Sequence, residues 1–425
     1  MTLSVRTRNL PIAVALLWLW GSVALFAFGP YDYLVRTPLV LYGYLTAANL
    51  ALFLGYRSRV NGQGAAYQGK WQPRQMLRLS LVLALFIMMF SVVSGQGRNL
   101  GFRAALEDPA LAYALYGESQ GTSFLPYILI FLEPFVFPFL ILTAFYWQET
   151  KLLIRLTFFL ILTVNIMGAV SIALRGAIVF QVITVGAAFL SAFLGGRWKL
   201  GVLSKLQITV LIIAGVLLLL AFFSLIYSQR SPGTATSFNP SIGQFPDPDH
   251  LITQITPESQ KPLVFGAITY LTHGYYGLSL ALDKPFVGVG FGVTNSTFLL
   301  RNFVRFTGLD VLYDFSYANR LWVENGYPVG NYWISIYPWI ASDVTWFGSL
   351  IIVFLIGRLF AQSWLDAVQG TNPAAVIVFV VLAHMIYAFP MNNPLQDGSA
   401  LTRFYFWLLF WWFTRMPQAQ TASTI

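Results

Sequence analysis

The sequence has no cysteine, only three histidines and few charged residues, which make up 10% of its 425 positions. Without cysteine the chain has no disulfide framework, no thiolate metal site and no cysteine nucleophile. Three histidines leave little material for a histidine-built metal centre. Charge this sparse excludes an ordinary soluble domain, in which about a quarter of the residues are charged.

Hydrophobic residues are abundant instead: they make up 57% of the chain, and the mean hydropathy is +0.67. Aromatic residues reach 17%, and they favour both membrane interfaces and sugar-binding clefts. Motifs of soluble enzymes are missing, among them a P-loop, an HExxH sequence and a nucleophile elbow. The composition therefore predicts an all-α, polytopic integral membrane protein.

About ten apolar runs approach the length of about 20 residues that a helix needs to cross the hydrocarbon. They divide the chain into residues 1–227 with seven spans, a loop at 228–344, and residues 345–425 with three spans and a C-terminal tail. The last run is short, so it could begin earlier or lie partly in the interface. The runs are Leu10–Phe28, Pro38–Tyr56, Leu79–Ser94, Phe124–Trp147, Leu156–Ala173, Ala177–Leu194, Leu206–Tyr227, Thr345–Ala361, Ala374–Pro390 and Phe404–Thr414.

Lysine and arginine predict the orientation, because cytoplasmic connections carry an excess of both. When the spans are threaded alternately in and out, one side collects most of the basic residues and, among the acids, only Glu149 and Asp366. This side includes both termini and is predicted to be the cytoplasm. The formal net charge of +9 is therefore a topology signal and does not indicate nucleic-acid binding.

The loop at 228–344, on the opposite side, is too long to be a simple connection. Residues Ser228–Lys261 are rich in Ser, Thr, Pro, Gly and Gln, which predicts a mobile coil or lid. The rest turns apolar and aromatic and is predicted to form a structured, partly helical external subdomain. Within it, Leu263–Leu282 is predicted to be an amphipathic or re-entrant helix and not a span. GVGFG at Gly288–Gly292 lacks the strand–helix unit of a dinucleotide site and predicts a turn.

Several arginines outside the predicted cytoplasmic side could hold an anion. Arg175 lies in a turn between two apolar spans, where a charge is costly without a partner. It either reaches out to the headgroups or grips a phosphate or carboxylate with its fork. Arg301 and Arg305 share a face if Thr297–Phe306 is helical, which suits a diphosphate or, equally, anionic lipid. Arg403, just before the last run, is predicted to be an interface anchor.

Arg320 lies in the stretch ANRLWVENGYPVGNYW, together with Glu324. A mixture of a cation, a carboxylate, amides and aromatic rings suits a sugar site, because apolar sugar faces stack on rings while hydroxyls pair with polar groups. The candidate sugar contacts in this stretch are Trp322, Asn331, Tyr332 and Trp333.

Acid or base candidates occur in two settings. Glu133 lies within a span, in FLEPFVFP, where the prolines should kink the helix. An intramembrane carboxylate is functional by default, unless it pairs with an arginine from another helix. His384 lies in the outer half of its span, as a satisfied core histidine or a proton carrier. The external candidates, which the sequence does not rank, are Asp314, Glu324, Asp343 and His273.

Three stretches resemble segments of the O-antigen and oligosaccharide repeat-unit polymerases. GNYWISIYPWIASDVTWFGSL, Gly330–Leu350, resembles the segment that leads from their large periplasmic loop back into the membrane. ALRG, Ala173–Gly176, resembles their arginine at an outer helix turn. ITYLTHGYYGLSLAL, Ile268–Leu282, resembles the amphipathic stretch within their loop. The resemblance in architecture covers most of the chain.

The resemblance implies an enzyme of the bacterial inner membrane that joins undecaprenyl-diphosphate-linked oligosaccharides at the periplasmic face. It implies no metal or other cofactor, and it gives Arg175 and Arg320, with Arg301 or Arg305, the role of holding the donor diphosphate. The related O-antigen ligases carry a histidine where this chain has Asn331, which favours a polymerase and leaves the general base unassigned. The implied partners are the donor and acceptor lipids and membrane lipid, and they could include a chain-length regulator.

Two other classes of protein remain open. A lipid-linked oligosaccharide flippase needs polar residues along a central cavity in both leaflets, whereas the polar residues here gather on one side. A structural subunit of an envelope complex would show no dependence on the external arginines.

Overall fold

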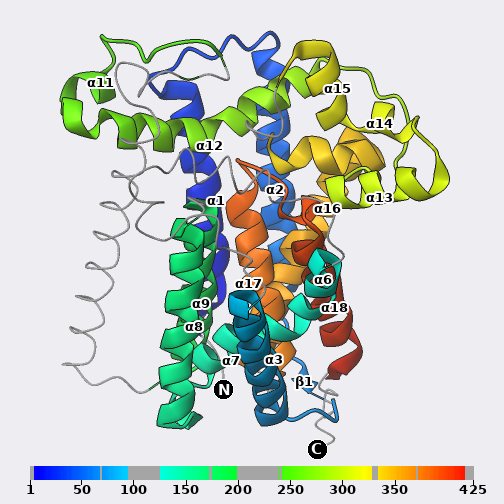
Figure 1. Cartoon of the computed structure of the whole chain (residues 1–425). Helices are drawn as coiled ribbons and strands as arrows, with labels where there is room; N and C mark the ends of the chain where they lie inside the picture. The colour runs from blue at the N-terminus through cyan, green and yellow to red at the C-terminus, as the bar shows by residue number, and fades with distance from the viewer. Residues whose placement is uncertain are drawn as a thin grey trace, which may run out of the picture.

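The computed structural model describes residues 4–67, 69–93, 125–171, 175–198, 239, 242–327, 334–369 and 372–416. This part of the chain is helical, and its only sheet is a pair of two-residue antiparallel strands, β1 (Ala66–Tyr67) and β2 (Arg415–Met416). Long helices form an upright bundle, and shorter helices cover one end of it (Figure 1). We call the covered end the outer end and the opposite end the inner end.

Six apolar helical stretches in the described residues are long enough to cross a membrane, and α17 is a shorter apolar helix. By helix length and hydropathy the chain is therefore a multi-pass membrane protein. The bundle consists of α1 (Val5–Phe28), α2 (Pro38–Val60), α3 (Pro73–Val93), α6 (Leu125–Val136), α7 (Pro138–Phe145), α8 (Leu152–Ser171), α9 (Arg175–Leu194), α16 (Ile336–Val368), α17 (Pro373–Ala388) and α18 (Gly398–Thr414), with a single 3₁₀ turn, η1 (Trp147–Glu149), after α7.

The prediction of about ten spans is confirmed only in part. The six long stretches correspond to α1, α2, α6 with α7, α8, α9 and α16. The predicted spans Leu79–Ser94 and Phe404–Thr414 fall on α3 and α18, which extend beyond them toward their N-termini. The predicted span Leu206–Tyr227 lies outside the described residues.

The external subdomain lies over the outer end. Its helices are α11 (Leu251–Ile255), α12 (Lys261–Leu282), α13 (Thr297–Thr307), α14 (Leu312–Phe315) and α15 (Tyr317–Asn325), with the 3₁₀ turns η3 (Glu258–Gln260) and η4 (Pro394–Gln396). The longest of them, α12, runs across the outer ends of α1 and α2 (Figure 1). The prediction of a helix that is not a span at Leu263–Leu282 is confirmed.

Hydroxyl groups and a close backbone contact fix α12 on the bundle. Tyr33 Oη and Thr272 Oγ1 lie 2.6 Å apart, and Tyr275 Oη lies 2.8 Å from Ser22 Oγ of α1. Gly274 allows α12 to press against the end of α17, because a side chain at this position would collide with the carbonyl of Pro390. These contacts fix α12 across the outer end, and we call this helix the lid.

The helix α16 joins the subdomain to the bundle and bends at Thr345. This residue has φ 71°, a left-handed conformation that a branched side chain rarely adopts. The predicted span Thr345–Ala361 begins at the bend. The outer segment before it, Ile336–Asp343, is buried, and it belongs to the core of the subdomain as well as to that of the bundle.

Asp366 is fully buried at the inner end of the bundle and connects several segments there. Its carboxylate accepts hydrogen bonds from the backbone N–H of Ala65 (2.6 Å), from Trp411 Nε1 (2.9 Å) and from Arg415 Nε (3.1 Å). These contacts, with the β1–β2 pair, join α16, the segment after α2 and the end of α18. We call this group of contacts the inner latch.

Candidate functional site

The outer half of the bundle contains an ion pair between α6 and α18, in which the arginine is buried and the Glu133 side chain is 29% exposed. Glu133 Oε1 accepts a hydrogen bond of 2.9 Å from Nη1 of Arg403, whose side chain is 9% exposed. Pro134 and Pro138 interrupt the helix at this point, so that α6 ends at Val136 and α7 begins at Pro138. The predicted kink is confirmed, and so is the alternative in which Glu133 pairs with an arginine from another helix.

Aromatic rings surround the arginine. The guanidinium carbon of Arg403 lies 4.2 Å from the ring centre of Phe137 and 4.7 Å from that of Phe180. Such cation–π contacts stabilise a cation where water is excluded. The Nε of Arg403 has no hydrogen-bond partner in the described part of the chain. The prediction that Arg403 is an interface anchor is wrong, because α18 begins at Gly398 and places this residue inside the bundle.

His384 of α17 completes this cluster. Its ring packs edge-on against Phe180 of α9 at 4.2 Å between centroids. The ring of Tyr387, one turn further, stacks on Trp18 of α1, whose indole N–H donates to the Tyr387 carbonyl. The cluster of Glu133, Arg403, Phe137, Phe180 and His384 therefore lies where α6, α7, α9, α17 and α18 meet, and we call it the ion-pair cluster.

Arg175 is the first residue of α9, five residues before Phe180. That spacing is about 7.5 Å along a helix, toward the outer end. The next residue, Gly176, lies under α12, since a Cβ there would be 3.4 Å from the hydroxyl of Tyr270. The first turn of α9 therefore lies between the ion-pair cluster and α12, and a helix N-terminus carries a partial positive charge.

His273 lies on the same helix as Tyr270, with 6.1 Å between the centres of the two rings. Its Nδ1 lies 2.6 Å from the carbonyl oxygen of Thr269 and donates to it, because a carbonyl can only accept. The Nε2 is buried without a hydrogen-bond partner in the described residues. Burial lowers the pKa of His273 to about 4, which keeps the ring neutral and its Nε2 lone pair available.

The side chains of Arg320 and Glu324 are engaged with each other and with their neighbours. Arg320 Nε donates to Glu324 Oε1 at 3.0 Å, and Arg320 Nη1 donates to the carbonyl of Pro285 at 2.7 Å. Lys284 donates to the other carboxylate oxygen at 2.6 Å. Lys284 and Arg320 together lower the pKa of Glu324. These contacts tie α15 to the segment after α12 and favour a structural role for both residues.

Asp343 holds the GVGFG segment in place. It is 3% exposed, and its oxygens accept hydrogen bonds from the backbone N–H groups of Thr294 and Asn295 and from the Thr294 hydroxyl. Gly290 approaches the same carboxylate so closely that a Cβ there would collide with it. The segment is a turn, as predicted, and the three bonds leave Asp343 poorly placed to accept a proton.

The helix α13 carries Arg301 and Arg305 on one exposed face, so the helix predicted there is confirmed. It lies over α6 and the start of α18, since Phe298 packs against Gly398, and Thr297 donates to the carbonyl of Gln396.

Two other candidates are exposed at the outer end. Asp314 lies in the one-turn helix α14, and Trp322, on α15, is 55% exposed. The candidate sugar contacts Asn331, Tyr332 and Trp333 lie outside the described residues.

Comparisons with family models, curated proteins and solved structures found no match. The arrangement at the outer end provides a buried cation, a helix N-terminus that begins with arginine, and a neutral imidazole on α12. These are groups that bind an anion and accept a proton.

Proposed function

We propose that this protein polymerises undecaprenyl-diphosphate-linked oligosaccharide units into a surface polysaccharide at the periplasmic face of the bacterial inner membrane. The observation that carries the proposal is the placement of positive charge inside the outer half of the bundle. Arg403 lies beside Phe180, and the first turn of α9, five residues before Phe180, lies beneath α12. Glu133 compensates the charge of Arg403 from one side, and the Nε of Arg403, which has no partner in the described residues, remains to bind an anion.

The reaction needs little beyond charge stabilisation. A hydroxyl oxygen of the acceptor glycan attacks the anomeric carbon of the donor, the bond from that carbon to the diphosphate oxygen breaks, and the hydroxyl proton passes to a base. The diphosphate leaves with the bonding electrons, still attached to its lipid. Cations near its oxygens stabilise the developing charge, which is the role we give to Arg175 and Arg403, with Arg301 and Arg305 at the entrance.

His273 is the base that the contacts support best. Asp343 accepts three hydrogen bonds and Glu324 is held between two cations, whereas His273 Nε2 has no partner in the described residues. The ring is neutral because burial disfavours its cation, and the positive charge that it gains with the proton would be offset by the negative charge that develops on the diphosphate. Under the lid, the glycan would be shielded from water, which would otherwise compete as acceptor.

The proposal is tested by Arg175→Ala in cells that make the polysaccharide. We expect long chains to disappear from the surface glycan while membrane insertion stays normal. Arg36→Ala is the matched control, because Arg36 is exposed and distant in sequence from the site. Unchanged chain-length ladders in the Arg175 variant would refute the proposal. Product found on lipid A core instead of the lipid carrier would identify a ligase, and a block in lipid translocation would identify a flippase.

A further inference from the structure

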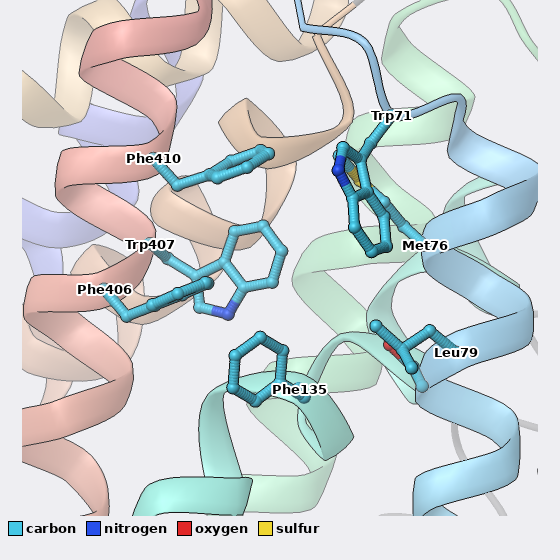
Figure 2. A pocket seen from close by; sticks show the side chains of 8 residues that line it. Trp71, Met76, Leu79, Phe135, Phe406, Trp407 and Phe410 are labelled. Carbon is cyan, nitrogen blue, oxygen red and sulfur yellow. The ribbon is translucent and has the colours of Figure 1, made fainter.

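A cavity of about 170 Å³ lies between α3, α6 and α18. The rings of Phe406, Trp407 and Phe410 project from α18 toward Trp71 and Met76 on the other side, and Phe135 projects from α6 (Figure 2). The cavity is apolar and rich in aromatic rings, and Leu79 and Ser80 complete its lining. A cavity of about 150 Å³ lined by apolar side chains holds a molecule the size of benzene, so this one accepts about one isoprene unit of a longer chain.

The cavity is bordered by surfaces that face lipid. Val82 of α3 and Leu409 of α18 are more than half exposed, as expected for the lipid-facing sides of membrane helices. Because α6 packs against both α3 and α18, it holds the other two helices around the cavity. A chain can therefore enter sideways from the bilayer.

The ion-pair cluster lies about one helical turn outward from the cavity. Arg403 precedes Phe406 and Trp407 by three and four residues, so it lies on the same face of α18, one turn further out. Trp407 Nε1 donates to the carbonyl of Pro134 at 2.7 Å, which joins α18 to the break after Glu133. Above the apolar rings there is thus a buried guanidinium with one unused N–H.

We propose that this cavity binds the isoprenoid chain of a polyprenyl phosphate, with its phosphate beside Arg403. The inference rests on the proposed function, which requires a lipid of this class, and it adds the path of the chain. The cavity is a single apolar space with one cation, Arg403, beyond its outer end, and this arrangement matches a lipid that has one chain and one terminal anion. A glycerophospholipid, with two chains joined at its headgroup, fits this shape less well.

The test uses the purified full chain in nanodiscs and a polyprenyl phosphate that carries a diazirine in its first isoprene units. We expect photolabel on peptides of α18 and α6 that include Phe406 or Phe135. Unlabelled polyprenyl phosphate should compete at least tenfold better than phosphatidylglycerol. Equal competition by the two lipids would overturn the proposal, since the cavity would then bind bilayer lipid in general.

Two cavity variants test the location. Leu79→Trp and Ser80→Leu fill the space from α3 and should each reduce labelling at least fivefold. Leu50→Trp, at an exposed position of α2 that does not line the cavity, is the matched control and should leave labelling unchanged. Using two variants guards against misfolding of one, which size-exclusion chromatography would reveal. Labelling that persists in both folded variants would refute the location.

The polar end is tested with the neutral double variant Glu133→Gln with Arg403→Gln. It should lower labelling by polyprenyl phosphate about tenfold and leave labelling by an uncharged polyprenol probe unchanged. An equal effect on both probes would show that Arg403 does not hold the phosphate.

The proposed function and this inference can fail separately. If Arg175→Ala abolishes the polymer but the cavity variants leave photolabelling unchanged, the inference is wrong and the proposed function stands. If Arg175→Ala leaves the polymer normal but the cavity variants reduce photolabelling, the polymerase proposal is wrong and the inference about the cavity stands.

Discussion

Replacement of Asp366 by alanine should destabilise the bundle more than any loss of a surface charge. The substitution leaves the N–H groups of Ala65 and Trp411 without an acceptor and leaves Arg415, whose side chain is 12% exposed, without its carboxylate. An unsatisfied buried donor costs about 1 to 3 kcal/mol, and removal of one partner of a buried ion pair costs about 3 to 5 kcal/mol. Because such losses overlap, we expect about 4 kcal/mol in total.

The measurement is unfolding of the purified chain in mixed micelles, followed by circular dichroism. Asp366→Asn keeps one acceptor oxygen and should lose roughly half as much. Glu258→Ala is the control, because the Glu258 side chain is 87% exposed in its pair with Lys261, and an exposed pair contributes about 0 to 1 kcal/mol. A loss below about 1 kcal/mol in Asp366→Ala would show that the inner latch does not hold the helices together.

Three further predictions follow from particular residues. Gly55→Leu should push α2 away from α16, because a side chain at this position meets the α16 backbone. It should lower the free energy of unfolding by at least about 2 kcal/mol. Gly21→Leu is the control and should change the free energy of unfolding little, because there is open space around Gly21. Burial lowers the pKa of His273 to about 4. The free energy of unfolding should therefore rise with pH between about 4 and 6.5, since the unfolded chain binds more protons than the folded one in this range. A His273→Gln variant in which the free energy of unfolding rises with pH by the same amount would contradict this. Single cysteines at Thr307 and Gln72, both exposed, should differ in intact cells, with an impermeant maleimide labelling only the Thr307 site; the reverse result would invert the proposed topology.

Hydrophobic runs and charge predicted much of the bundle, because the length of an apolar helix is set by the bilayer. The α12 helix was also predictable, since His273 and several glycines interrupt an otherwise apolar run. The start of α18 confirms the alternative in which the last run begins earlier: Asp397 caps the helix through the N–H of Ala400, so the helix includes a polar turn that hydropathy assigns to a loop. Hydropathy alone therefore places Arg403 at the interface and not in the interior.

The roles of single side chains were harder to predict, because their partners lie far away in the sequence. Asp343 bonds to Thr294, 49 residues earlier, and Glu324 bonds to Lys284, 40 residues earlier. Sequence spacing does not reveal such pairs, so both carboxylates remained candidates for the base. The sequence alone indicates that Glu133 needs a partner, because a lone charge within a membrane span is costly.

The inner latch also bears on how the protein is made. Its β1 strand and Ala65 leave the ribosome about 350 residues before the β2 strand and Arg415 that complete it. At roughly 5 to 20 residues per second, the first half of the latch waits about 20 to 70 seconds for its partner. A chain truncated before α18 can never close it, so completion of the inner end distinguishes a finished protein from an interrupted one.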